Sequence, residues 1–253
     1  MQNALIYTLV FLAIQVIVSI LASRGLAITG HAEWAHSPYL LIGVSAVSSL
    51  LTIAMFWCLR WAEVSGRYLL SRPYMVVCWS ILAALGAVVP SMYLQEQLPE
   101  LPNIVEKELT AMMSVKGGYF VICLLVPLAE ELVMRGAVLR ALLMWKPDRH
   151  WLMIVISALL FALIHLNLAQ MPHAFLIGLL LGWMFYRTNS IVPTVAYHWA
   201  NNTVAFILTK LYPNPDLRLV DVLGTQQSVL LAVAFSLLIL LPSIYQLHVW
   251  MKK

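Results

Sequence analysis

Charged residues are scarce in this sequence. Only 10% of its 253 residues are charged, and 62% are apolar. Ordinary soluble domains are about 25% charged and about 45–50% apolar. A water-soluble fold of this size leaves roughly a quarter of its unfolded surface exposed, so it has no place for so much apolar surface. The composition excludes an ordinary soluble domain and predicts that the lipid bilayer is the solvent.

Cysteines and basic clusters are also few. The cysteines, Cys58, Cys78 and Cys123, lie singly inside apolar runs and form no C-x-x-C pair, which indicates small buried side chains rather than disulfides. The net charge is +4, but no group of Lys and Arg is interleaved with aromatic residues, so we expect no nucleic-acid partner. The first apolar run, Ala4 to Ala22, has no basic segment before it, and we expect a retained helix rather than a cleaved signal.

Long apolar runs dominate what remains. A bilayer core about 30 Å thick requires about 20 apolar residues in a helix, and open strands cannot span lipid. We therefore predict an all-α, polytopic membrane protein of about eight transmembrane helices with the active site inside the bundle, as a single integral membrane domain over residues 1–253. The predicted spans are residues 3–22, 39–59, 74–94, 117–144, 151–168, 173–187, 191–212 and 226–247.

The loops between these runs differ in basic residues. Nine Lys and Arg residues follow the even-numbered spans, and five lie in the other loops. The positive-inside rule then predicts that both termini are cytoplasmic. We expect a multi-pass protein of a bacterial inner (plasma) membrane. The longest hydrophilic stretch, Gln95 to Lys116, is predicted to be a solvated loop, with a surface helix over 103–115 or a lid over a cavity as the alternatives.

Ionisable side chains interrupt the predicted fourth span. Such groups are costly in hydrocarbon and indicate function by default. Glu131 and Arg135 are four residues apart on one helical face, which favours an ion pair. Glu130 points about 100° away and is left without that partner. The alternative is a purely structural buried network, but one arginine neutralises only one carboxylate.

Two later spans carry further polar residues. Phe161 and His165 are four apart, and so are His198 and Asn202. Alone, His165 is typical of a hydrogen-bonded core histidine, and a His–Asn pair can join helices. Together with Glu130, these residues form a set that can activate water, move a proton and stabilise an oxyanion. On the predicted span limits their depths differ by about 10 Å, so convergence requires either different span limits or tilted or broken helices.

The order of these motifs resembles the CPBP family, the CAAX-prenyl-protease-type or Abi intramembrane endopeptidases. The matching pattern is Glu-Glu-x-x-x-Arg, then Phe-x-x-x-His, then His-x-x-x-Asn, and it lies in a predicted catalytic core over residues 117–212. The resemblance implies that Glu130 is the general base and that His165 assists it. It implies that His198 and Asn202 stabilise the oxyanion, while Glu131, Arg135 and Phe161 support the site.

The resemblance leaves the cofactor open, because the family includes both metallopeptidase and glutamic-peptidase descriptions. If a metal such as zinc is present, its ligands are expected to be Glu130, His165 and His198. No H-E-x-x-H motif is present, and the stretch from His31 to His36 has the wrong spacing. We favour a glutamate-activated water without metal.

The resulting hypothesis is an endopeptidase that cleaves a membrane-associated peptide or protein. A proton-coupled membrane transporter is an alternative, because intramembrane Glu and His also build proton relays. A non-catalytic membrane scaffold is a second alternative. The sequence does not define the oligomeric state or the substrate.

Overall fold

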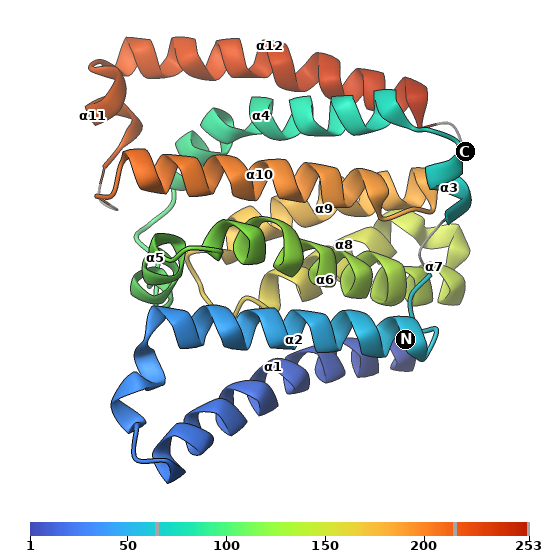
Figure 1. The fold of residues 1–253 in the computed structure, drawn as a ribbon. Helices are drawn as coiled ribbons and strands as arrows, with labels where there is room; N and C mark the ends of the chain where they lie inside the picture. The colour runs from blue at the N-terminus through green and yellow to red at the C-terminus, as the bar shows by residue number, and fades with distance from the viewer. Residues whose placement is uncertain (64–65, 215–216, 252–253) are drawn as a thin grey trace.

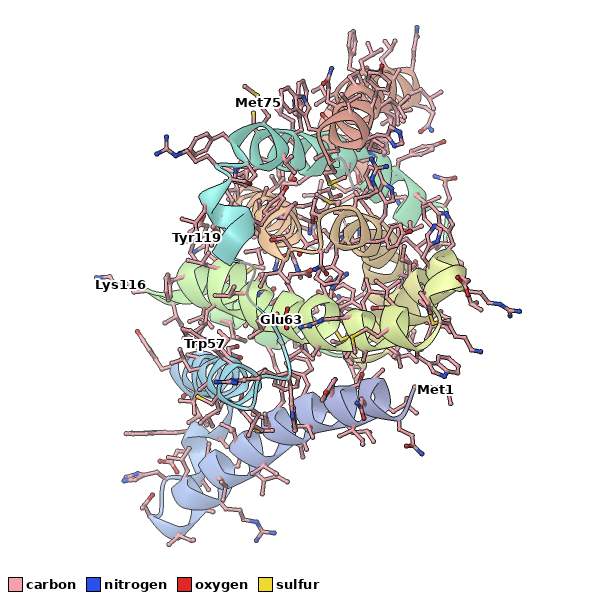
Figure 2. All side chains as sticks on the ribbon, turned by 90° about the vertical axis from the view of Figure 1, so that its right-hand side faces the viewer. Met1, Trp57, Glu63, Met75, Lys116 and Tyr119 are labelled. Atoms are coloured by element: carbon pink, nitrogen blue, oxygen red, sulfur yellow. The ribbon has the colours of Figure 1, made fainter. Side chains whose placement is uncertain are left out.

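The computed structural model describes residues 1–63, 66–214 and 217–251, and these residues contain helices but no strand. The long helices lie side by side as a bundle (Figure 1). Both chain termini lie at one end of this bundle, near α3 and α7, and we call it the termini end. The opposite end carries α5 and α11, and we call it the α5 end. Figure 2 views the molecule from the termini end, with α1 at the margin of the bundle.

Four helices among the described residues are long and apolar enough to cross a membrane. They coincide with the first, second, third and eighth predicted spans. For the described residues, the prediction of an all-helical protein with membrane-spanning helices is therefore confirmed. Their bounds are α1 Gln2–Ile28, α2 Pro38–Cys58, α4 Tyr74–Glu96 and α12 Gln226–Trp250. The count of eight spans stays a prediction.

The four middle predicted spans are shorter or less regular helices. The fourth is one helical rod made of η2 Phe120–Leu125, α6 Val126–Glu131, η3 Leu132–Leu139 and α7 Arg140–Trp145. The others are α8 His150–Leu163, α9 Met171–Thr188 and α10 Val192–Leu211. At about 1.5 Å per residue, the 14 residues of α8 cover about 21 Å. This helix is shorter than a hydrocarbon core of about 30 Å, so it ends inside the bundle.

The rod that contains Glu130 is not a uniform α-helix. Both η2 and η3 are π-helical, and they flank the short α-helical piece α6. Pro127 lies at the start of α6 and has no N–H to donate, which favours an irregular hydrogen-bond pattern before it. π-helical turns are rare and are frequently found at functional sites.

Short elements close the two ends of the bundle. They are η1 Ala32–His36, α3 Gly66–Leu70, α5 Glu106–Ser114, η4 Pro147–Arg149 and α11 Leu219–Leu223. Helix α5 lies in the stretch predicted to be a solvated loop, so the surface-helix alternative is correct over these nine residues. Met113 of α5 is buried, which shows that this helix packs on the bundle rather than extending into solvent.

The tightest packing surrounds η3. All eight of its residues are buried, and Val133, Met134 and Leu139 have essentially no exposed surface. Apolar side chains from other helices complete this core, among them Phe56, Met153, Ile154 and Phe185. The rod is therefore fixed on every side just beyond Glu130 and Glu131.

Helices α4 and α12 approach each other closely at Gly86. A Cβ atom added there would lie 2.6 Å from the backbone nitrogen of Leu240, whereas a Cβ at Gly43 of α2 would meet nothing within 4 Å. Alanine favours a helix over glycine by about 1 kcal/mol at either position. We expect Gly43→Ala to be neutral or stabilising and Gly86→Ala to destabilise by about 1–3 kcal/mol through overpacking.

Thermal unfolding of both variants in the same detergent checks this prediction. The order of the two melting temperatures is the decisive quantity, because both variants make the same chemical change in a helix. A Gly86→Ala variant as stable as Gly43→Ala would contradict the close α4–α12 contact.

Candidate active site

One cavity of about 350 Å³ collects most of the residues that the motifs single out. Its wall includes Glu130, Phe161, His165, His198 and Asn202. These residues come from α6, α8 and its following turn, and α10, so three separate predicted spans converge. Helix α8 ends at Leu163, so His165 lies in the turn after it and lines the same cavity as Glu130 and His198.

A buried ion pair lies behind this cavity. Arg135 Nη1 donates to Glu131 Oε1 at 2.9 Å, and both side chains are essentially inaccessible to solvent. The Arg135 guanidinium also stacks on Phe161, with Cζ 4.3 Å from the ring centroid. Burying two charges is costly, and the attraction between them offsets part of that cost. The ion pair predicted from the four-residue spacing is present.

The same carboxylate fixes the orientation of His198. Nδ1 of His198 lies 2.9 Å from Glu131 Oε1, and the carboxylate can only accept, so Nδ1 carries the proton. The other ring nitrogen, Nε2, then faces Glu130, with 3.7 Å to Oε2. This arrangement resembles the carboxylate–histidine pairs that set a ring tautomer elsewhere in proteins.

His165 is held in the same tautomer by a different partner. Its Nδ1 lies 2.8 Å from the carbonyl oxygen of Phe161, which can only accept. Nε2 of His165 is therefore the nitrogen free to exchange protons. The Phe161 ring lies edge-on to both imidazoles, with centroid distances of 5.0 Å to His165 and 5.9 Å to His198. Phe161 thus separates and positions the two histidines.

Asn202 is anchored to the rod that carries Glu130. Its Nδ2 donates to the carbonyl oxygen of Ile122 at 3.1 Å, and its Oδ1 accepts from Asn201 at 3.3 Å. In a π-helical pattern the Ile122 carbonyl faces residue 127, and Pro127 has no N–H to offer. The proline therefore leaves an acceptor for Asn202, whose second amide hydrogen remains available to the cavity.

Residues 114–204 match the model of a protein family described as type II CAAX prenyl endopeptidase Rce1-like. The resemblance to the CAAX-endopeptidase family is confirmed over this segment. It runs from the end of α5 into α10 and contains every motif residue from Glu130 to Asn202. No curated protein sequence and no solved structure matches the chain in the same comparisons.

A metal was one possibility for the CAAX-endopeptidase segment, with Glu130, His165 and His198 as its ligands. Among the residues that the structure describes, no group of three or more His, Cys, Asp and Glu side chains is arranged to hold a metal ion. A glutamate-activated water without a metal stays a prediction.

The cavity also contains polar residues that the motifs did not indicate. His173 stands in the first turn of α9 and hydrogen-bonds with Asn201. Gln95 and Gln170 line the cavity as well. The only sequence signal for His173 was a titratable residue at the first position of the predicted span 173–187.

Asn167 is a second residue that the sequence did not indicate, and its side chain is fully buried. Its Oδ1 accepts from the backbone nitrogen of Ile104 at 3.2 Å, and its Nδ2 donates to Asn103 Oδ1 at 2.9 Å. Ala169 adds a backbone bond to Pro102 at 3.3 Å. These bonds fasten the turn that carries His165 to the segment that leads into α5. Asn167 therefore helps to position both the turn and that segment.

Removing the cation of the buried pair should destabilise the protein strongly. Arg135→Met leaves Glu131 buried without its neutralising partner, which typically costs about 3–5 kcal/mol. The matched control is Arg140→Met, because Arg140 pairs with the largely exposed Glu63 at 2.6 Å, and surface pairs contribute about 0–1 kcal/mol. Chemical unfolding in detergent compares the two, and similar losses would contradict a specific role for the buried pair.

Asn167→Ala should loosen the segment over the cavity without unfolding the bundle. The substitution leaves the Ile104 N–H without its side-chain acceptor, at a cost of about 1–3 kcal/mol. Hydrogen–deuterium exchange should therefore speed up in residues 103–114 and stay unchanged in η3, which serves as the internal control. Asn103→Ala, which keeps the bond to Ile104, should have a smaller effect. Equal acceleration throughout the chain would mean general destabilisation instead.

Proposed function

We propose that this protein is an intramembrane endopeptidase that hydrolyses a membrane-associated peptide or protein with a water activated by Glu130. The observation that carries the proposal is the different environment of two adjacent glutamates. Glu131 is fully buried and committed to Arg135 and His198. Glu130 is 14% exposed, lines the cavity and, among the residues that the structure describes, forms no ion pair with a Lys or Arg.

Glu130 is the general base. Its carboxylate accepts a proton from a water molecule in the cavity, and the water oxygen attacks the carbonyl carbon of the scissile amide. The 3.7 Å between Glu130 Oε2 and His198 Nε2 is too long for a direct hydrogen bond, so both groups are available to a molecule in the cavity. Apolar walls from Phe161 and Ile177 limit the access of bulk water.

The developing oxyanion is stabilised from α10. His198 holds Nδ1–H against Glu131, so in the doubly protonated form its Nε2–H points to the cavity and donates to the oxygen. The remaining amide hydrogen of Asn202 provides a second donor. Donors that are already oriented stabilise the transition state more than mobile water does, and one such donor contributes about 2.7–4 kcal/mol in a well-studied protease.

Proton transfer then completes the reaction. The protonated Glu130 returns its proton to the nitrogen of the leaving amine, the C–N bond breaks, and a carboxylic acid and an amine are released. His165, with Nε2 free, assists by relaying this proton. Glu131, Arg135 and Phe161 do not touch the substrate and act as positioning residues.

The first test is the conservative variant Glu130→Gln. It keeps the size and the hydrogen-bonding capacity of the side chain but cannot take a proton, so hydrolysis should fall by about 10²–10⁴-fold. Membrane proteomes from cells with wild-type and Glu130→Gln protein should differ by a precursor that accumulates in the variant. That precursor then serves as the substrate for rate measurements with purified protein.

The matched control is Glu63→Gln, which changes an exposed glutamate at the termini end. It should keep the wild-type rate, and both variants should keep the wild-type melting temperature. Full cleavage of the precursor by Glu130→Gln would overturn the assignment of the base. A pH-gradient-driven ion flux in liposomes without cleavage would support the transporter alternative instead.

A further inference from the structure

The cavity is closed toward the termini end of the bundle. Directly beyond Glu130 and Glu131, every residue of η3 is buried. Helix α8 contributes Met153 and Ile154 to this packing, and α9 contributes Phe185. Close-packed interiors of this kind leave few voids larger than a water molecule. A substrate therefore cannot reach Glu130 from this side without disrupting the core.

A second hollow at the termini end does not change this conclusion. It measures about 590 Å³ and is lined by Arg140, Met144, Pro147, Tyr186 and others. None of its lining residues is shared with the cavity around Glu130. Leu139, which has no exposed surface, belongs to the packed layer beside it.

The cavity approaches the surface at the α5 end. Helix α8 stops at Leu163, and the turn after it brings His165 and Gln170 to the cavity wall. The remaining cover is α5, whose Leu109 and Met112 line the cavity from outside the long helices. Figure 1 shows α5 at the end opposite to both termini. The access route therefore lies beside α5, Gln95 and Gln170.

The basic residues are divided unequally between the two sets of predicted loops. Counted along the sequence, the loops after the even-numbered predicted spans contain Arg60, Arg67, Arg72, Arg140, Lys146, Arg149, Arg187, Lys252 and Lys253. The other loops contain Arg24, Lys107, Lys116, Lys210 and Arg218. Figure 1 places α3 and α7, which border the first group, at the termini end and α5 and α11 at the other.

We propose that the active-site cavity opens toward the non-cytoplasmic face of the membrane, and that the substrate is a segment of an exported or membrane-anchored polypeptide exposed on that face. The positive-inside rule places the termini end in the cytoplasm. The closed core then faces the cytoplasm, and the route beside α5 faces outward. This inference rests on the proposed function for its substrate, and on charge and packing for its orientation.

This orientation has a consequence for substrate specificity. A tail presented from the cytoplasm meets the buried side chains of η3, whereas a segment on the other side meets Gln95, Gln170 and His173 before Glu130. The two glutamine side chains are uncharged hydrogen-bonding groups, and His173 is uncharged unless its ring is protonated. They suit the amide groups of an extended polypeptide better than a charged end group.

Cysteine labelling in intact cells tests the orientation independently of activity. Cys58 and Cys78 are exposed, contrary to the prediction of buried side chains, whereas Cys123 is buried. In a background with Cys58→Ser and Cys78→Ser, which keeps only the buried Cys123, one cysteine at a time is introduced as Glu108→Cys in α5, Asp148→Cys in η4 or Gln170→Cys in the cavity. Glu108 and Asp148 are both exposed, so they form a matched pair. The probe is a membrane-impermeant maleimide, applied before and after permeabilisation.

The expected result is labelling of Glu108→Cys and Gln170→Cys in intact cells, and of Asp148→Cys only after permeabilisation. The reverse pattern would overturn the orientation. Equal labelling of Glu108→Cys and Asp148→Cys in intact cells would also overturn it, because it would indicate mixed insertion. A Gln170→Cys variant that labels only from the side of Asp148, or from neither side, would overturn the proposed access route.

The substrate half of the inference is tested with the precursor that accumulates in Glu130→Gln cells. Its cleavage site should lie in a segment on the non-cytoplasmic side, as mapped by protease protection of the precursor in sealed vesicles. A cleavage site on the cytoplasmic side would overturn this inference while leaving the endopeptidase intact. The absence of any precursor, combined with the expected labelling, would count against the proposed function and not against the orientation.

Discussion

Glu131 is the group on which the rest of the site depends. Its Oε1 contacts both Arg135 Nη1 and His198 Nδ1 at 2.9 Å, so one buried atom joins the helical rod to α10. Arg135 in turn stacks on Phe161, which separates the two imidazoles. Because an unmatched charge in this apolar core would be very costly, these partners cannot be exchanged independently. Glu130 is not part of the Glu131–Arg135 ion pair and is directed into the cavity.

Departures from regular helices create the space in front of this buried group. Pro127 and the flanking π-helical turns alter the rod near Glu130, and α8 ends well before the bundle does. Eight regular helices of equal length would fill this volume with side chains. The cover is supplied by α5, which Asn167 fastens to the turn after His165. A polar cavity inside a membrane bundle thus depends on a few interrupted segments and one buried asparagine.

The two ends of the bundle are chemically and mechanically different. At the termini end the rod is packed against α8 and α9, and the loops that border α3 and α7 there are richer in basic residues than the loops that border α5 and α11. At the α5 end the cavity reaches a segment held by a small number of hydrogen bonds. The orientation in the membrane and the direction of access are therefore linked, because one end supplies the topology signal and the other the opening.

The sequence by itself determined that the protein is a helical membrane protein, and it indicated residues that the structure brings to the wall of one cavity. Apolar runs long enough to span lipid indicate helices without reference to contacts, and the four-residue spacings of Glu131 and Arg135 or Phe161 and His165 follow from helix geometry alone. Only the tertiary structure decided that Glu131 rather than Glu130 binds His198, that α8 is short, that His173 lines the cavity and that Asn167 joins the turn after His165 to residues 103–104. These features depend on contacts between residues far apart in the chain, such as 67 positions between Glu131 and His198, and local periodicity contains no information about them.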